Sequence, residues 1–184
     1  AAPLYAEVAG RVRLSAGGEA VSGATVALRG TNQSATIPER TAVTDSLGEF
    51  RFSAVPAGSF VLVASKAGFA QRKAYGIGVT AARGRAGIEL LLTTGGTIEG
   101  VVTDEKGAPA AGLPVRAERG NPNLRVGETK TDAAGLYRFE HLLPEQYHVE
   151  VTRGREQTQT GFVEVTDDQV ARLDFRSDAS LAGL

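Results

Sequence analysis

The feature that most constrains the fold is an internal repeat that covers almost the whole chain. When the sequence is shifted on itself by about 88 residues, the segment 44–52 (TDSLGEFRF) aligns with 131–139 (TDAAGLYRF). Matches before and after this segment keep the same order, and the shift drifts only from 90 to 85 residues. A repeat of this kind indicates a duplicated domain. We therefore expect two domains, at residues 1–94 and 95–184, joined by a short connection at 93–97 (TTGGT).

Each copy shows the two-residue alternation of apolar and polar side chains that is typical of strands with one buried face. In the opening segment, Val8, Val12 and Leu14 alternate with charged residues. Further strands are expected in the first copy near residues 24–28, 50–52, 59–65, 72–79 and 87–92, and in the second copy near 98–102, 113–117, 137–139, 147–151, 163–165 and 171–175. No segment has a convincing helical period, so we expect an all-β fold.

About six or seven short strands per copy, separated by Gly-containing turns, are typical of a Greek-key β-sandwich. In the turn at 45–48 (DSLG), the Asp can bond its own backbone two residues on, and the Gly can adopt the positive φ that ends the turn. The aromatic residues that follow this turn in both copies are expected to fill the core between the two sheets. We therefore predict two tandem seven-stranded Greek-key β-sandwiches.

The second copy resembles the carboxypeptidase regulatory-like domains through its opening at 100–104 (GVVTD) and 107–112 (GAPAAG), the 131–139 segment, and Leu143-Pro144 followed by Tyr147. The first copy keeps the 44–52 segment and 55–60 (VPAGSF) but departs from the pattern at 15–19 (SAGGE). The resemblance spans residues 7–176 and implies a transthyretin-like sandwich, immunoglobulin-like in architecture. It also implies a tandem module of bacterial surface or secreted proteins. Family members are attached to peptidases, transporters, adhesins and secretion components alike, so the resemblance implies a fold rather than an activity.

The composition excludes several kinds of site. The chain has no Cys, so it can form no disulfide, iron–sulfur cluster or thiolate zinc site. No run approaches the roughly 18 apolar residues of a membrane-spanning helix, so we expect no membrane insertion in this segment. Met is absent even at position 1, and we expect that a signal peptide or further domains precede Ala1 in the gene product.

The net charge of −1 conceals an asymmetry between the two copies. Residues 1–94 hold 10 Lys and Arg against 6 Asp and Glu, a net charge of +4, while residues 95–184 hold 10 against 15, a net charge of −5. Such an asymmetry can favour contacts between opposite ends of neighbouring molecules or oriented docking on a charged partner. The alternative, which we favour at this point, is ordinary divergence between duplicated sequences.

The basic segment, residues 66–85, is the main candidate binding surface. Its basic and aromatic residues are Lys66, Phe69, Arg72, Lys73, Tyr75, Arg83 and Arg85. Such residues can hold a polyanion or stack on sugar rings, but edge strands also carry Lys and Arg to prevent aggregation. We favour the edge-strand interpretation. The stretch 76–81 (GIGVTA) imitates a dinucleotide fingerprint, which we discard because no helix is expected to follow it.

Three other groups of residues are candidate sites. His141 and His148 flank a predicted hairpin turn around Pro144-Glu145 and could hold a metal with Glu140 or Glu150, but exposed polar positions are the favoured interpretation. Asp167 and Asp168, with Glu164 and Asp174 nearby, offer only a fragment of a calcium loop, so a solvated turn is favoured. A glycosylation sequence is present at 32–34 (NQS).

No residue pattern is typical of an enzyme, because neither copy offers a nucleophile beside a base or a full set of metal ligands. We expect a non-catalytic spacer or protein-docking segment of a larger exported bacterial protein, located extracellularly, at the cell surface or in the periplasm. Its partners would be neighbouring domains or another surface protein, with no cofactor, no metal and no nucleic acid. The alternative is a carbohydrate- or protein-binding module of the adhesion type that uses its loops or the basic segment.

Overall fold

The computed structural model describes residues 5–31, 37–80, 83–120, 125–154 and 157–176. All regular secondary structure in these ranges is β-strand, which confirms the all-β prediction. The chain divides into two compact units, Ala1–Thr93 (unit 1) and Thr94–Leu184 (unit 2). The boundary predicted from the sequence, after residue 94, lies one residue from this division and stays a prediction. In the described part of the chain, no helix is long and apolar enough to cross a membrane.

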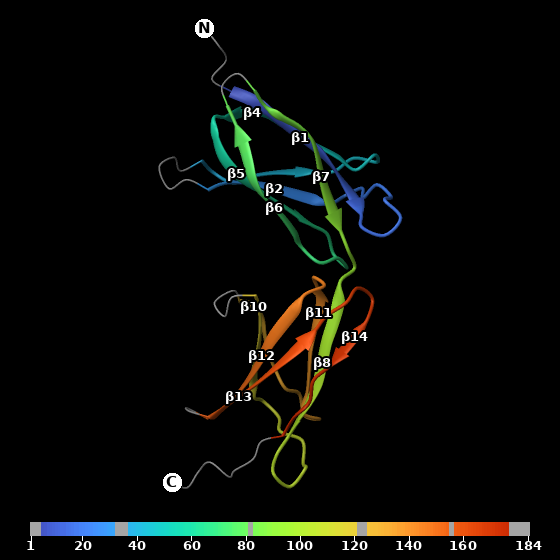
Figure 1. The fold of residues 1–184 in the computed structure, drawn as a ribbon, viewed down its shortest axis with the longest axis vertical. Helices are drawn as coiled ribbons and strands as arrows, with labels where there is room; N and C mark the ends of the chain where they lie inside the picture. Colours follow the sequence, from blue (N-terminus) through green and yellow to red (C-terminus); the bar gives the residue numbers. More distant parts are fainter. Residues whose placement is uncertain (1–4, 32–36, 81–82, 121–124, 155–156, 177–184) are drawn as a thin grey trace. The chain divides into compact units, whose positions relative to one another are not determined.

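Unit 1 is built from two facing sheets (Figure 1). Its strands are β1 (Tyr5–Leu14), β2 (Thr25–Gly30), β3 (Arg40–Val43), β4 (Glu49–Pro56), β5 (Gly58–Ser65), β6 (Arg72–Val79) and β7 (Arg85–Leu92). Within the described residues, one sheet has the order β4-β1-β7 and the other β3-β2-β5-β6. The pairing of β1 with β7 is parallel, and the other pairs are antiparallel.

Unit 2 repeats this arrangement (Figure 1). Its strands are β8 (Gly96–Thr103), β9 (Pro114–Arg119), β10 (Arg125–Lys130), β11 (Leu136–Leu142), β12 (Gln146–Arg153), β13 (Gln157–Glu164), β14 (Val170–Arg172) and β15 (Phe175–Arg176). In the described ranges, one sheet is β10-β9-β12-β13, and the other is β11-β8-β14 with β15 also paired to β8. The strands β14 and β15 both run parallel to β8.

The core of each unit lies between its two sheets and is formed by the inward-facing residues of the alternating strands. In unit 1 the largest buried side chains include Phe52 and Phe60, and in unit 2 they include Tyr147 and Ile98. Burial of these side chains is the main stabilising contribution, at roughly 25 cal/mol per Å² of apolar surface. The aromatic residues that follow the Asp-x-x-Gly turn are buried in both units, as the sequence predicts.

A glycine in the first strand of each unit permits a close backbone contact within one of the sheets. A Cβ on Gly10 would lie 2.2 Å from the carbonyl oxygen of Ile88, and one on Gly100 would lie 1.8 Å from that of Leu173. The ring of Phe50 covers the first glycine, and the ring of Tyr137 covers the second. The shared Gly and aromatic positions of the repeat therefore form one packing unit, in which the ring occupies the space that a side chain would need.

The structure corrects the predicted hairpin around Pro144-Glu145. The strands before and after it, β11 and β12, belong to different sheets, so this segment is a crossing between sheets. The same holds for β4 and β5 in unit 1.

The predicted last strand of unit 2, at 171–175, is interrupted. At Leu173-Asp174 the carboxylate of Asp174 replaces a backbone carbonyl and accepts the N–H of Val101 at 2.8 Å. The strand is therefore divided into β14 and β15. The strands β3 and β10 were not predicted at all.

Candidate binding surfaces

The repeated Thr-Asp-x-x-Gly segment is a structural device in both units. The Oδ1 atom of Asp45 accepts the backbone N–H groups of Leu47 and Glu49, both at 2.9 Å. In unit 2, Asp132 accepts the equivalent two N–H groups at 2.8 and 2.9 Å. These carboxylates therefore organise turns in the way that Asp side chains commonly do.

The Thr that precedes each of these Asp residues is buried, with 4% of its surface exposed in both units. The hydroxyl of Thr44 donates to the Val21 carbonyl at 2.6 Å and accepts the Ala24 N–H at 2.9 Å. Thr131 makes the same two bonds in unit 2, to Ala110 and Leu113. Because both hydroxyls have a donor and an acceptor inside the fold, these threonines fasten the loop before the second strand of each unit.

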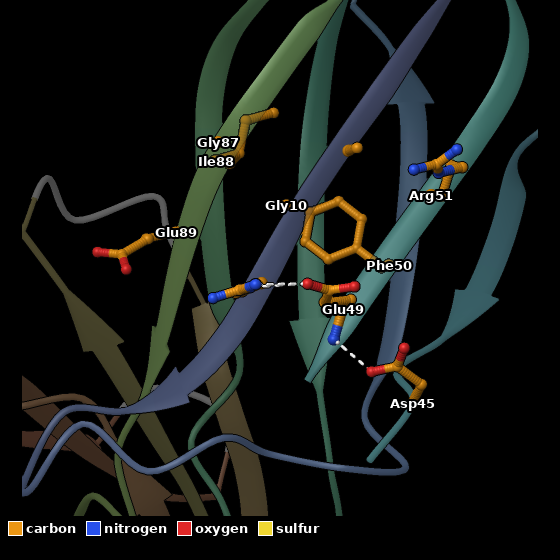
Figure 2. A pocket seen from close by; sticks show the side chains of 10 residues that line it. Gly10, Asp45, Glu49, Phe50, Arg51, Gly87, Ile88 and Glu89 are labelled. Carbon is orange, nitrogen blue, oxygen red and sulfur yellow. Dashed lines mark hydrogen bonds and ion pairs between the residues drawn. The ribbon is translucent and has the colours of Figure 1, made fainter. Parts of the chain in front are cut away.

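A pocket of about 520 Å³ lies on the outer face of the β4-β1-β7 sheet (Figure 2). Gly10 and Gly87 are among the residues that line it, and a Cβ on Gly87 would meet nothing within 4 Å. Across this part of the sheet, Val8 is opposite Arg85 and Gly10 is opposite Ile88, so β7 has one residue more than β1. Gly87 accommodates this bulge with a φ of 70°. The hollow is therefore a consequence of sheet geometry.

Apart from Asp45, whose carboxylate organises its turn, the charged side chains that line this pocket are engaged in ion pairs along the sheet. Figure 2 shows the Glu49 carboxylate bonded to a guanidinium, which belongs to Arg11, with distances of 3.0 and 2.6 Å. Glu89 pairs with Arg13 at 3.4 Å, and Arg51 pairs with Glu7 at 3.3 Å. Alternating opposite charges of this kind satisfy one another across strands, so the pocket presents no concentrated charge for a ligand.

The structure places the basic segment over several elements of unit 1. Arg72, Lys73 and Tyr75 lie on β6, which is an edge strand, as the favoured interpretation requires. Tyr75 is 69% exposed. Arg85 begins β7 in the other sheet, and Arg83 lies before it in the connection from β6. The segment therefore extends from one sheet to the other, and its role as a binding face stays a prediction.

Two members of the basic segment have structural contacts. The ammonium of Lys66 donates to the Ser22 carbonyl at 2.8 Å and lies 6.0 Å from the centre of the Phe69 ring. Phe69 itself packs against the core of unit 1. Lys66 is nonetheless exposed, as are the members of the segment on β6 and near the start of β7.

The two histidines lie in different sheets of unit 2 and have different partners. His141, on β11, has its Nδ1 atom 3.0 Å from the Thr94 carbonyl oxygen, so Nδ1 carries the donated proton. His148, on β12, has its ring centre 5.0 Å from that of Phe162. In the described residues, no three His, Asp or Glu side chains gather in a way that could hold a metal ion.

Two of the acidic residues at the end of unit 2, Asp168 and Asp174, have structural partners. The carboxylate of Asp168 accepts the hydroxyl of Thr94, and the Asp168 N–H donates to the Gly95 carbonyl at 3.0 Å. Asp174 bonds Val101 and also pairs with Arg172 at 3.3 Å. These contacts favour a structural role for Asp168 and Asp174. The glycosylation sequence at 32–34 lies outside the described residues.

Two buried tyrosines of unit 2 were predicted as core residues, but their hydroxyl bonds were not. The Tyr137 hydroxyl donates to the Leu173 carbonyl at 2.5 Å, and the Tyr147 hydroxyl donates to the Leu143 carbonyl at 3.0 Å. Burial, and secondarily the nearby Asp174 carboxylate, raises the pKa of Tyr137. Burial raises the pKa of Tyr147 to about 12. Unit 1 has Phe50 and Phe60 at the equivalent positions, so these hydroxyls are specific to unit 2.

Comparison with solved structures finds bacterial pilins among the similar chains. A streptococcal ancillary pilin shares 12% identity with a TM-score of 0.47, and the match covers 96% of this chain and 63% of the pilin. The minor pilin GBS52 of Streptococcus agalactiae shares 12% identity, with a TM-score of 0.49 and coverage of 92% and 94%. The shaft pilin SpaA of Lactobacillus rhamnosus GG shares 9% identity, with a TM-score of 0.41 and coverage of 95% and 98%.

No curated protein matches the chain significantly. The family model that matches is the carboxypeptidase regulatory-like domain, and it matches twice, at residues 7–92 and 97–178. These two ranges take in most of the sequence and confirm the predicted resemblance. The chain therefore belongs to the carboxypeptidase regulatory-like domain family and contains two tandem copies of that domain.

Proposed function

We propose that the two units form a non-catalytic spacer or protein-docking segment of a larger exported bacterial surface or envelope protein. The proposal places the segment extracellularly, at the cell surface or in the periplasm. Family membership supports only the type of module, because such domains are attached to proteins with many different activities. The main support comes from the connection between the units.

The connection leaves no free residue between the last bond of unit 1 and the first bond of unit 2. The Thr93 carbonyl accepts the Ala70 N–H at 2.8 Å within unit 1. The next residue, Thr94, is bonded within unit 2 by His141 and Asp168. Gly95 has a φ of 71°, and a Cβ there would lie 2.5 Å from the Leu142 carbonyl oxygen. A connection with no unbonded linker residue suits a spacer, because flexible linker residues would let the ends of the spacer approach one another.

The absence of Cys from the chain allows a direct test with two introduced spin labels. Ser46 and Lys106 are exposed turn residues, one in each unit, and both can be replaced by labelled Cys. Pulsed electron spin resonance should give a narrow distribution of distances between the labels. Insertion of four Gly between Thr93 and Thr94 is the matched control and should broaden the distribution. A distribution in the parent chain as broad as that of the insertion variant would refute the spacer role.

A second candidate function is carbohydrate or protein binding through the basic segment. It is favoured by the exposed ring of Tyr75 beside Arg72 and Lys73, which make no ion pair among the described residues. A glycan array with the parent chain and the Tyr75→Ala variant tests the carbohydrate form. Binding that the substitution removes would support it, and no binding by the parent chain would refute it.

A further inference from the structure

Unit 2 has an edge strand without the usual charged protection. The strand β13 pairs only with β12 in the described part of the chain. From position 157 to 163 it carries no charged residue (QTQTGFV). Phe162 in this strand is 68% exposed, and its ring packs only partly on the ring of His148. Native edge strands are normally guarded by charges, bulges or covering segments, so an unguarded edge with an exposed ring indicates a contact surface.

Carboxylates lie on this strand and on β9, which is two strands away in the same sheet. Glu118 lies opposite His148 on β9, and Glu164 lies opposite Gln146 at the end of β13. Neither carboxylate forms an ion pair among the described residues. Glu145 is also near, paired with Arg119 at 3.6 Å. This surface, the acidic edge, therefore combines an exposed aromatic ring with unpaired negative charge.

Unit 1 has the complementary combination on its corresponding edge strand. β6 pairs only with β5 within the described residues. It exposes the Tyr75 ring together with Arg72 and Lys73, and no Asp or Glu occurs anywhere from position 66 to 85. This surface is named the basic edge. The repeat thus presents the same element of the fold twice, once basic and once acidic.

We propose that the acidic edge of one chain binds the basic edge of a second copy of the same chain. The net charges of +4 and −5 on the two halves favour contact between unlike units. Pairing two basic edges or two acidic edges would place like charges together, which disfavours it. Tyr75 and Phe162 would supply apolar contact at the centre, and the free backbone groups of the two edge strands would pair with each other.

The inference takes the protein-binding form of the second candidate function and names its partner. It is independent of the spacer role, because a stiff pair of units need not self-associate. A chain that stays monomeric would therefore refute this inference and leave the spin-label result unaffected. The interface is heterologous, so it permits dimers, rings or longer chains, and any of these supports the proposal.

Analytical ultracentrifugation of the full chain tests the inference. In about 10 mM salt, where the screening length is about 30 Å, the mass should rise above that of one chain as the protein concentration increases. In about 1 M salt, where the screening length is about 3 Å, association should be at least about tenfold weaker. A single-chain mass at every concentration in low salt, or association that salt does not weaken, would overturn the proposal.

Charge reversal identifies the two surfaces. The double variant with Arg72→Glu and Lys73→Glu should be monomeric alone. The double variant with Glu118→Lys and Glu164→Lys should also be monomeric alone. An equal mixture of these two double variants should associate again. The variant Lys106→Glu, Lys130→Glu makes the same change in net charge as the first, away from both edges, and should still associate.

Phe162→Ala should weaken association about tenfold, which is the usual effect of removing a central aromatic contact. Circular dichroism confirms that each variant is folded. Self-association that survives both reversals, or a mixture that does not recover, would overturn the proposal.

Discussion

Replacing Gly135 by Ala should destabilise unit 2 much more than replacing Gly107 by Ala. Both glycines end an Asp-x-x-Gly turn in the same unit, with φ of 72° and 80°, so both substitutions cost about 1–2 kcal/mol in a left-handed conformation. A Cβ on Gly107 meets nothing within 4 Å, whereas a Cβ on Gly135 lies 2.4 Å from the Val102 carbonyl oxygen and 3.1 Å from the Ala110 nitrogen. The comparison therefore isolates the effect of the close backbone approach.

The Val102 oxygen and the Ala110 nitrogen that the new Cβ would approach form one hydrogen bond with each other, and the Gly135 carbonyl takes part in a second one. Val102 donates to the Gly135 carbonyl at 2.8 Å, and Ala110 donates to the Val102 carbonyl at 2.9 Å. Weakening these bonds costs about 0.5–1.5 kcal/mol each. The total for Gly135→Ala is then about 2–5 kcal/mol, a large part of the 5–15 kcal/mol typical of a folded domain.

Urea unfolding followed by the near-UV circular dichroism of tyrosine measures this difference in unit 2. Tyr137 and Tyr147 are buried there, whereas Tyr5 and Tyr75 of unit 1 are exposed. The Gly135 variant should have a midpoint about 1 M lower than the Gly107 variant, given slopes of about 1–3 kcal/mol per M. Equal midpoints for the two variants would refute the argument from close approach.

Three other changes have expected outcomes. Burial raises the pKa of Tyr147 to about 12 and also raises the pKa of Tyr137, whereas tyrosines in the unfolded chain ionise near pH 10. Unit 2 should therefore keep its stability below about pH 10 and lose it as the pH rises towards 12. Urea midpoints of the tyrosine signal against pH check this, and a flat profile would contradict it. Thr44→Val should lower the stability of unit 1 by about 2–4 kcal/mol, because the Ala24 N–H and the Val21 carbonyl lose their buried partner. In thermal unfolding, Thr44→Ser should recover most of that loss. Equal losses in both variants would show that the hydroxyl does not stabilise the unit. Asp174→Ala should speed hydrogen exchange at the Val101 amide about tenfold, whereas Asp174→Asn should not. Unchanged exchange in the Ala variant would show that the Asp174 carboxylate does not protect this amide.

The parts of the fold that the sequence predicts are those with a local signal. The Asp45 and Asp132 turns, the aromatic residues that follow them and the alternating strands all depend on contacts between near neighbours or on burial of one face. The strand β3 (Arg40–Val43) was missed because it lies at an edge of its sheet and has no buried residue to produce an alternating pattern. The strand β10 lacks buried residues as well.

Other features depend on partners that are distant in the sequence. The interruption of the last strand at Asp174 requires the N–H of Val101, 73 residues away. The roles of His141 and Asp168 at the connection require Thr94, which no local pattern indicates. The acidic edge was not predicted as a surface, because its members come from β9, β12 and β13 and are brought together only by strand pairing. The register of β12 against its two neighbours is the signal that reveals it.

The measurement that most directly tests the account is native-state amide hydrogen exchange of the full chain in increasing urea. If the chain folds as two units with separate cores, the amides of β1 to β7 should exchange as one cooperative group and those of β8 to β15 as another, each with its own unfolding free energy. Gly135→Ala should then lower the second free energy and leave the first unchanged. A single cooperative group that includes strands of both units, destabilised as a whole by this substitution, would contradict the account.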